Sequence, residues 1–218
     1  MKKVNWGIVG LGNIADLFAK AFEFSIEGKL IGISSKSSNK LNKFRQKFKI
    51  EERYCFSNYE DLIICDDIDI VYIALPNSFH YKLIKKCIEN NKKFLVEKPA
   101  TISFKEIQDL KKNIESKNFF FAEALMYRYH PQILKVIELI NTNQIGKIIS
   151  MESYFGNDIL TRFNFLGIKI KKKINKAHRL YNKDLGGGAI LDLGCYVVSL
   201  STLIASLISK FEKVEIIN

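Results

Sequence analysis

The stretch VNWGIVGLGNIA, residues 4–15, decides the fold expected for this chain. It begins with an apolar run that predicts a β-strand at residues 4–9, and it leads into a helix expected at residues 13–24. The turn between them reads G-x-G-x-x-A, which in this position is typical of dinucleotide-binding turns. The apolar face expected on the helix consists of Ile14, Leu17, Phe18, Ala21 and Phe22.

Each residue of this turn has a physical task. Gly10 permits the tight bend, and Gly12 lets the backbone come close to a pyrophosphate. Ala15 lets the helix pack closely against the strand. The first helical residues, Asn13 and Ile14, offer backbone N–H groups and the positive end of the helix dipole to the phosphates. The turn therefore predicts a nucleotide site that includes Gly10, Gly12, Asn13 and Ile14.

Apolar runs and helical patterns alternate through the first half of the chain. Further strands are expected at 30–33, 68–75, 93–96 and 118–122, and further helices at 39–48, 79–90 and from Ser103 onward. Strands that are apolar on both faces and separated by helices indicate a parallel sheet covered on both sides. Antiparallel strands in an α+β domain are the alternative, but hairpin turn signals are nearly absent. We therefore predict a doubly wound α/β domain, a Rossmann domain, over residues 1–122.

Two of these helices carry clear local signals. The helix at 39–48 is expected to turn Leu41, Phe44 and Phe48 inward. Ser103 followed by Glu106 has the spacing of a capping box and predicts a helix start. The apolar stripe of that helix consists of Ile107, Leu110 and Ile114.

The second half of the chain, residues 123–218, has a different character. A helix is expected at 131–140, an alternating strand at 147–155, and a long polar and basic connection at 157–185. Three glycines at 186–188 then open an apolar helix that reaches about residue 207, and a last strand is expected at 214–217. This half is therefore predicted to be a second, smaller domain.

Composition and charge exclude several classes of protein. The 34 Lys and Arg exceed the 23 Asp and Glu, giving a net charge of +11. Only 5 of these basic residues are Arg, and the lysines are spread along the whole chain. Because phosphate forks and base readout favour Arg, we expect a solvated lysine surface and no nucleic-acid partner. We also expect no membrane span, no export signal and a cytoplasmic location.

The four cysteines do not form a metal-binding pattern. Cys55, Cys65, Cys87 and Cys195 include no C-x-x-C pair and have no His at ligand spacing. We therefore expect no metal, and reduced thiols in place of a disulfide framework.

The end of the second expected strand bears on cofactor choice. An NAD-binding domain usually has Asp or Glu here to hold the ribose 2′-hydroxyl, whereas this chain has Ser-Ser-Lys-Ser at 34–37. The hydroxyl of Ser35 and the charge of Lys36 suit a 2′-phosphate, so the sequence favours NADP over NAD. A loop of small polar residues that accepts both cofactors remains the alternative.

Two other motifs carry candidate chemistry. Glu97-Lys98-Pro99 follows a strand whose carboxyl end faces the ligand crevice of a parallel sheet. Asp192 and Tyr196 are four residues apart, which puts a carboxylate and a phenol on one face of an otherwise apolar helix. That pair indicates a site, although a buried polar pair whose members satisfy each other is the alternative.

Taken in order, these motifs resemble the Gfo/Idh/MocA oxidoreductase family (glucose–fructose oxidoreductase and inositol dehydrogenase). The resemblance rests on five segments in the family's order. They are GIVGLGNIA at 7–15, DIDIVYIALPNSFH at 67–80, EKPA at 97–100, EALMYRYHPQ at 123–132 and LGGGAILDLGCY at 185–196. The HRLYN…GGGAILDLGCY segment is most similar to the branch of dimeric dihydrodiol dehydrogenase and NADP-dependent xylose dehydrogenase.

The resemblance implies a Rossmann domain followed by a domain built on a large, mostly antiparallel open sheet. Members of the family are generally longer than this chain, so the resemblance implies that the second domain is incomplete here. A homo-oligomer is expected where that domain is whole. The cofactor-lining residues implied by the resemblance are Leu75, Pro76, Asn77, His80, Glu97 and Arg128, with Lys98 also beside the cofactor.

The implied activity is hydride transfer between a nicotinamide cofactor and a secondary alcohol or hemiacetal carbon of a sugar, polyol or vicinal diol. Tyr196 would act as the general acid–base, Lys98 would lower the pKa of that phenol and polarise the carbonyl, and Asp192 would orient Lys98 or a substrate hydroxyl. Where many members have His, this chain has Tyr196. The alternative is a non-catalytic nucleotide-binding protein or an inactive fragment of such an enzyme.

Overall fold

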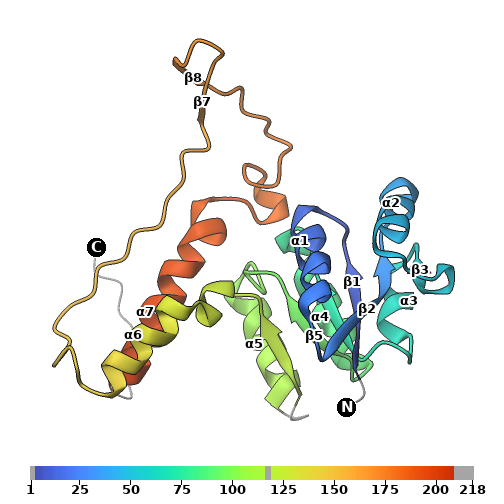
Figure 1. Ribbon diagram of the computed structural model, residues 1–218, viewed down its shortest axis with the longest axis horizontal. Helices are drawn as coiled ribbons and strands as arrows, with labels where there is room; N and C mark the ends of the chain where they lie inside the picture. The colour runs from blue at the N-terminus through green and yellow to red at the C-terminus, as the bar shows by residue number, and fades with distance from the viewer. Residues whose placement is uncertain (1–2, 116–118, 209–218) are drawn as a thin grey trace. The chain divides into compact units, whose positions relative to one another are not determined.

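The computed structural model describes residues 3–115 and 119–208 and divides into two compact units. Unit 1 comprises Met1–Ala124 together with Asp184–Gly186, and unit 2 comprises Leu125–Lys183 together with Gly187–Asn218. Each unit is described by itself (Figure 1).

The described residues of unit 1 form six strands and five α-helices that alternate along the chain. The strands are β1 (Val4–Val9), β2 (Gly28–Ser34), β3 (Cys55–Phe56), β4 (Ile70–Ile73), β5 (Lys93–Val96) and β6 (Phe121–Glu123). The helices are α1 (Asn13–Ala21), α2 (Ser38–Phe48), α3 (Tyr59–Ile64), α4 (His80–Glu89) and α5 (Phe104–Glu115). The predicted alternation of strand and helix is confirmed.

All six strands are parallel and lie in the order β3-β2-β1-β4-β5-β6. This is the order of the doubly wound dinucleotide-binding fold, with its switch point between β1 and β4, where ligands bind beyond the carboxyl ends of the strands. The predicted Rossmann class is therefore confirmed.

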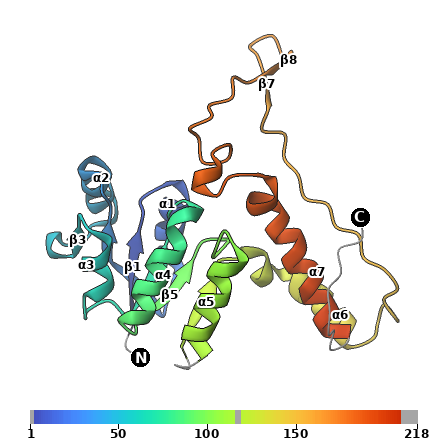
Figure 2. The ribbon, with the colours of Figure 1, turned by 180° about the vertical axis from the view of Figure 1, so that it is seen from behind.

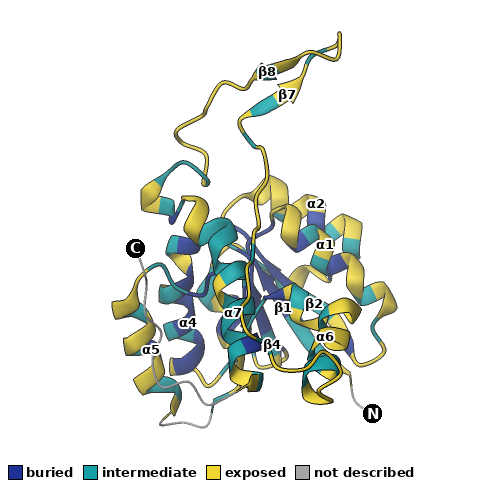
Figure 3. Cartoon of the chain, turned by 90° about the vertical axis from the view of Figure 1, so that its left-hand side faces the viewer, coloured by how far each residue is buried: buried dark blue, intermediate teal, exposed yellow. Residues whose placement is uncertain are grey.

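Helices cover both faces of this sheet, as Figures 1 and 2 show from opposite sides. One apolar cluster joins α1 and α2 to the sheet, and a second joins α3, α4 and α5 to the other face. In Figure 3 the buried residues of unit 1 concentrate on the strands and on the inner faces of the helices. Strands buried on both faces are apolar throughout, which explains runs such as β4, where Val71, Tyr72 and Ile73 are all buried.

The inward face predicted for α1 is wrong. Ile14 and Leu17 are 41% and 62% exposed, whereas Ala15 and Ala19 are buried, with Phe18 packed beside them. Two alanines one turn apart let the helix backbone approach the sheet closely, and that close approach outweighs the burial of larger side chains elsewhere on the helix.

The other predicted helix signals are confirmed in their main features. Phe44 of α2 is buried. Before α5, Ser103 accepts the backbone N–H of Glu106 at 3.3 Å, while the Glu106 carboxylate accepts the N–H of Ile102 at 3.0 Å. In the simple motif the Glu side chain accepts the backbone N–H of the capping residue, which here is Ser103, whereas in this structure it accepts the N–H of the residue before it. Sequence patterns did not reveal β3 and α3, because a two-residue strand and a six-residue helix are too short for periodicity.

Unit 2 contains α6 (Pro131–Asn141), the strands β7 (Thr161–Phe163) and β8 (Lys169–Lys171), and α7 (Cys195–Ile208). The two strands form an antiparallel pair within the predicted polar connection. Asn164 shapes their turn, because its Oδ1 accepts the N–H groups of Leu166 and Ile168, and Gly167 supplies a φ of +73°. This hairpin was not predicted.

The strand predicted at residues 147–155 is wrong, because these residues adopt no regular secondary structure. Ile149 and Tyr154 are about nine-tenths exposed. An alternating strand is stable only when another strand pairs with its backbone, and no described strand pairs with these residues. The strand predicted at 214–217 lies outside the described residues.

The expected apolar helix after the three glycines begins with a π-helical turn, Ile190–Gly194, and continues as α7. Within the described residues, the stretch Lys183–Ile208 is long and apolar enough to cross a membrane by length and composition, contrary to the expectation of no such stretch. A single helix of this kind is weak evidence for a membrane span, because core helices pass the same test.

Candidate functional site

The loops that follow β1, β2, β4 and β5 begin in one row across the sheet. Strand register pairs Val9 with Ser34 and with Ile73, and Ile73 with Val96. The ladder continues one step further, because the N–H groups of Gly10, Ala74 and Glu97 donate to the neighbouring strands' carbonyls at 2.8–3.0 Å. Since adjacent strands lie about 4.8 Å apart, this row brings the predicted cofactor loops together at one edge.

Gly10 is required by its backbone and by its surroundings. Its φ is +89°, a conformation that favours glycine, and a Cβ atom built on it would lie 2.6 Å from the carbonyl oxygen of Ala74. The side chain of Leu75 would lie 2.7 Å from the same Cβ. No larger residue fits this turn without displacing the β4 loop.

Gly12 lies in open space. A Cβ atom built on it meets nothing within 4 Å, and its carbonyl accepts the N–H of Asp16 at 3.1 Å as the first bond of α1. No side chain caps this helix start, and both Asn13 and Ile14 are exposed. The first N–H groups of α1 therefore face an open space, which suits an anionic group that approaches along the backbone.

The loop after β2 contains no carboxylate. Ser35 is buried and its Oγ accepts the N–H of Ser37 at 3.2 Å, while Ser37 caps α2. The exposed Lys36 places its Nζ 5.6 Å from the ring centroid of Tyr59, a cation–π contact. Burial raises the pKa of the Tyr59 phenol, and the nearby backbone N–H of Lys36 opposes that shift.

The segment after β4 carries four of the predicted residues. Leu75 and Pro76 lead into a turn in which Asn77 is buried and donates from its Nδ2 to the carbonyl of Gly186 at 2.8 Å. A Cβ atom on Gly186 would lie 2.7 Å from the Cβ of Asn77. Asn77 thus fastens the short segment Asp184–Gly186 to unit 1.

His80 is fully buried between two backbone carbonyls. Its Nδ1 lies 2.8 Å from the Pro99 oxygen and its Nε2 lies 2.8 Å from the Leu75 oxygen. Burial lowers the pKa of this imidazole, and the two carbonyl contacts oppose the shift. Both ring nitrogens are occupied, so His80 joins the loops after β4 and β5.

Two carboxylates hold the Glu97-Lys98-Pro99 segment. Glu97 accepts the hydroxyl of Tyr72 at 2.5 Å, and Glu123 of β6 accepts the backbone N–H of Ala100 at 2.8 Å. Lys98 itself is half-buried between these two anchors. Tyr72 and Glu123 were not singled out from the sequence. A Tyr inside an apolar strand was the available signal, because a buried phenol needs a hydrogen-bond partner.

In unit 2, Tyr196 and Arg128 share a cluster. The Tyr196 ring packs edge-on against Phe155 and Tyr127, with centroids 5.4 Å and 6.2 Å apart. The Tyr127 hydroxyl and the Arg128 guanidinium both contact the Ser199 hydroxyl, at 2.8 Å and 3.1 Å. Tyr127, Phe155 and Ser199 were not identified from the sequence.

Asp192 lies in the π-helical turn and forms an ion pair with Arg179 at 3.5 Å. A π-helical turn contains slightly more than four residues, so residues four apart still lie close to one face. The pairing of Asp192 with Tyr196 stays a prediction, and the π-helical turn is a departure from the ideal α-helix expected there.

Metal chemistry finds no support in the described part of the chain. No group of three or more His, Cys, Asp or Glu side chains gathers there, and the four cysteines form no disulfide bond within the described residues. Burial raises the pKa of the Cys87 thiol to about 12, so this cysteine is an unreactive core residue.

Comparison with known proteins agrees with this geometry. The family described as "Oxidoreductase family, NAD-binding Rossmann fold" (GFO_IDH_MocA) matches residues 4–124, and the "GFO/IDH/MocA C-terminal domain" matches residues 133–214.

Two curated relatives are similar to most of the chain. Trans-1,2-dihydrobenzene-1,2-diol dehydrogenase of Xenopus tropicalis is 28% identical over 91% of this chain and 56% of its own length. D-xylose 1-dehydrogenase (NADP(+)) of Hypocrea jecorina is 29% identical over 88% of this chain and 51% of its own length. The chain therefore spans about half the length of these relatives.

A crystal structure of a putative NADPH-dependent oxidoreductase from Desulfitobacterium hafniense has the same fold. It superposes with a TM-score of 0.78 and 26% identity, over 94% of this chain and 56% of that one.

Proposed function

The chain belongs to the GFO/IDH/MocA oxidoreductase family, and on that premise we propose that it is part of an NADP-preferring enzyme of sugars, polyols or vicinal diols. The reaction is hydride transfer at a secondary alcohol or hemiacetal carbon. The observation that carries the proposal is the row of loops at one edge of the parallel sheet, with Gly10 in a conformation that favours glycine and Gly12 in open space.

The residues at this edge fit a dinucleotide. The turn at Gly10 and Gly12 and the uncapped start of α1 receive the pyrophosphate through backbone N–H groups. Leu75, Pro76 and Asn77 line the middle of the edge. Asn13 and Ile14 flank the phosphates.

NADP preference is proposed from the loop after β2. Lys36 is exposed and offers its ammonium to a 2′-phosphate, while no carboxylate there repels that dianion. Tyr59 holds the Lys36 side chain through the cation–π contact. Ser35 shapes the loop by accepting the N–H of Ser37, and its hydroxyl is the second group that we assign to the 2′-phosphate.

A bound nicotinamide would supply or accept the hydride. Lys98 carries positive charge at the end of β5 and polarises the substrate oxygen. Glu97 and His80 position Lys98 through the contacts with Tyr72, Leu75 and Pro99.

The proposed roles in unit 2 concern proton transfer and orientation. Tyr196 exchanges a proton with the substrate oxygen as general acid–base. Asp192, paired with Arg179, orients a substrate hydroxyl. Arg128 binds near the nicotinamide of the cofactor.

The test combines binding with turnover. NADPH and NADH are titrated against the protein by calorimetry, and NADPH oxidation is then measured with a panel of aldoses, inososes and diketones. We expect NADPH to bind at least tenfold more tightly than NADH and at least one carbonyl compound to be reduced. Failure to bind either dinucleotide contradicts the proposal.

The second candidate is a nucleotide-binding protein without catalysis. It is favoured because the turn at Gly10 and Gly12 and the loop at Lys36 all lie in unit 1, so nucleotide binding needs no residue of unit 2. NADPH binding without turnover in the full-length protein, with every substrate of the panel, supports this candidate over the enzyme.

A further inference from the structure

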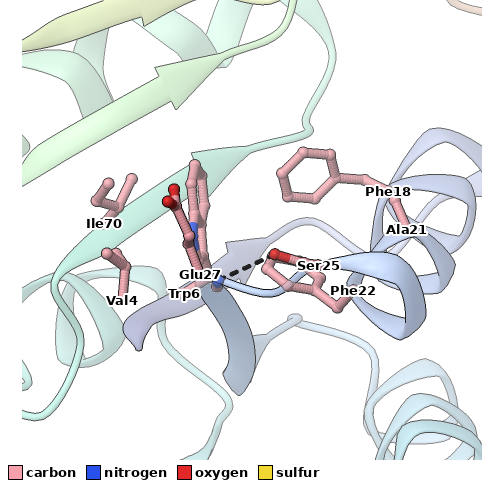
Figure 4. A pocket seen from close by; sticks show the side chains of 9 residues that line it. Val4, Trp6, Phe18, Ala21, Phe22, Ser25, Glu27 and Ile70 are labelled. Atoms are coloured by element: carbon pink, nitrogen blue, oxygen red, sulfur yellow. Dashed lines mark hydrogen bonds between the residues drawn. The ribbon is translucent and has the colours of Figure 1, made fainter. Parts of the chain in front are cut away.

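An aromatic pocket of about 330 Å³ opens at the amino end of the sheet in unit 1 (Figure 4). It is formed by the starts of β1 and β2 and by the end of α1. The lining side chains that define its chemistry belong to Trp6, Phe18, Phe22, Ser25 and Glu27, with Gly28 beneath them.

This pocket is separate from the proposed dinucleotide site. β1 runs from Val4, which lines the pocket, to Val9, which precedes the glycine turn. At about 3.3 Å per residue the two ends of this strand are roughly 17 Å apart. A ligand in the pocket therefore does not compete with the dinucleotide.

Three rings that line the pocket pack against one another at steep mutual angles. Trp6 lies 5.5 Å from Phe18 at 63° and 5.9 Å from Phe22 at 60°, and the two phenylalanines lie 5.4 Å apart at 88°. A flat ligand would need parallel walls on which to stack. Rings set at these angles offer no parallel pair of walls, so they favour a compact, branched group over a flat one.

Gly28 keeps this space open. A Cβ atom on Gly28 would lie 3.1 Å from Nε1 of Trp6, 3.2 Å from Cε1 of Phe22 and 3.2 Å from Oγ of Ser25. Its own N–H donates to that Oγ at 2.9 Å, which fixes Ser25 at the edge. The side chain of any larger residue at position 28 would occupy part of the pocket.

The rim of the pocket carries negative charge. Glu27 is exposed, and among the described residues no Lys, Arg or His forms an ion pair with it, although the chain as a whole has a net charge of +11. A carboxylate beside three aromatic rings attracts a cation, because both the carboxylate and the ring faces are negative.

We propose that this pocket binds an organic ammonium ion with several alkyl groups on nitrogen, such as a trimethylammonium group. The shape of the ring enclosure selects a rounded group, and Glu27 selects a positive one. Each methyl group contacts an aromatic face, as in known aromatic cages for quaternary ammonium ions.

The single tryptophan of the chain makes the test direct, because Trp6 lies in the pocket and its fluorescence has no background from another indole. Choline and tetramethylammonium are titrated, with 3,3-dimethylbutan-1-ol as the uncharged counterpart of choline. We expect a saturable change with both cations and binding of the neutral alcohol that is at least about threefold weaker. Equal binding of choline and the alcohol, or no saturable change with either cation, overturns the proposal.

Matched variants distinguish a change in the pocket from a general change in surface charge or folding. Glu27→Gln should weaken choline binding about two- to fivefold, whereas Glu23→Gln, on the same exposed segment but outside the lining, should not change it. Gly28→Ala should block binding. Circular dichroism and NADPH affinity, both unchanged in Glu27→Gln, show that the fold and the other site are intact. Unaltered choline binding in both Glu27→Gln and a folded Gly28→Ala would falsify the assignment.

Discussion

The hydroxyl of Tyr72 donates to the carboxylate of Glu97 at 2.5 Å, and this bond links the centre of the sheet to the segment that carries Lys98. The Tyr72 ring is 1% exposed and packs against Phe18, with centroids 4.1 Å apart. A buried phenol on β4 thus orients the residue that precedes the proposed catalytic lysine.

Tyr72→Phe should therefore destabilise unit 1. The substitution keeps the ring and leaves Glu97 without this donor, which costs about 1–3 kcal/mol in the free energy of unfolding. Urea unfolding measures the loss. Tyr54→Phe is the control, because the Tyr54 hydroxyl donates to Asp67 at an exposed position, and it should change stability by no more than about 0.5 kcal/mol. Equal losses for the two variants contradict the proposed anchoring role of Tyr72.

The two glycines of the turn should respond differently to substitution. Gly10→Ala meets the Ala74 carbonyl at 2.6 Å in a backbone conformation with φ of +89°, so it should lower the melting temperature clearly. Gly12→Val has open space for its side chain, so it should fold normally and lose dinucleotide binding. Thermal unfolding and NADPH titration distinguish the two. Normal NADPH binding by Gly12→Val removes the pyrophosphate-binding role of this turn.

The preference for NADP over NAD should depend on Lys36 and on the Tyr59 ring that its ammonium group contacts. Lys36→Ala removes a charge-assisted hydrogen bond worth roughly 1.5–3 kcal/mol, so NADP affinity should fall by about tenfold or more while NAD affinity stays constant. Tyr59→Leu should cause a smaller loss in the same direction, because it removes only the cation–π contact. Calorimetric titration of both cofactors measures the ratio. An unchanged ratio in Lys36→Ala shows that the 2′-phosphate lies elsewhere.

His80 should make stability sensitive to acid. Burial lowers the pKa of His80 in the folded state, so the unfolded chain takes up a proton at higher pH than the folded chain does. Its contribution to stability is then present above the ordinary histidine pKa of about 6.5 and is lost as pH falls below it, by up to about 1.4 kcal/mol per pH unit.

Unfolding by urea at several pH values between 5 and 8 tests this dependence. His80→Gln should remove that part of the slope, whereas His178→Gln, at an exposed position in unit 2, should leave it in place. A slope that is the same in all three proteins shows that His80 does not titrate in this range.

The sequence predicted unit 1 well because its signals are local. Strands apolar on both faces and the G-x-G-x-x-A turn each need only a few adjacent residues, and the parallel sheet follows from them. The inward face of α1 was predicted wrongly because hydrophobicity ranks Ile14 and Leu17 above Ala15 and Ala19, while the sheet requires small residues.

Unit 2 was harder to predict because its signals depend on partners distant in sequence. Residues 147–155 alternate like a strand, but alternation does not supply the neighbouring strand that would pair with them. Helical spacing suggested one face for Asp192 and Tyr196, and periodicity does not reveal the π-helical turn between Ile190 and Gly194. The contacts of Tyr127 and Arg128 with Ser199 join residues about seventy positions apart, beyond the reach of local patterns.

The most direct test of the proposed enzyme is the turnover and melting temperature of Tyr196→Phe, measured on the same samples of the full-length protein with NADPH and a reducible carbonyl substrate. The ring keeps its packing against Phe155 and Tyr127, so the fold and the NADPH affinity should be nearly unchanged. Loss of the general acid–base should lower turnover by about 10²–10⁴-fold. A Tyr196→Phe protein that is destabilised but fully active per folded molecule contradicts the account.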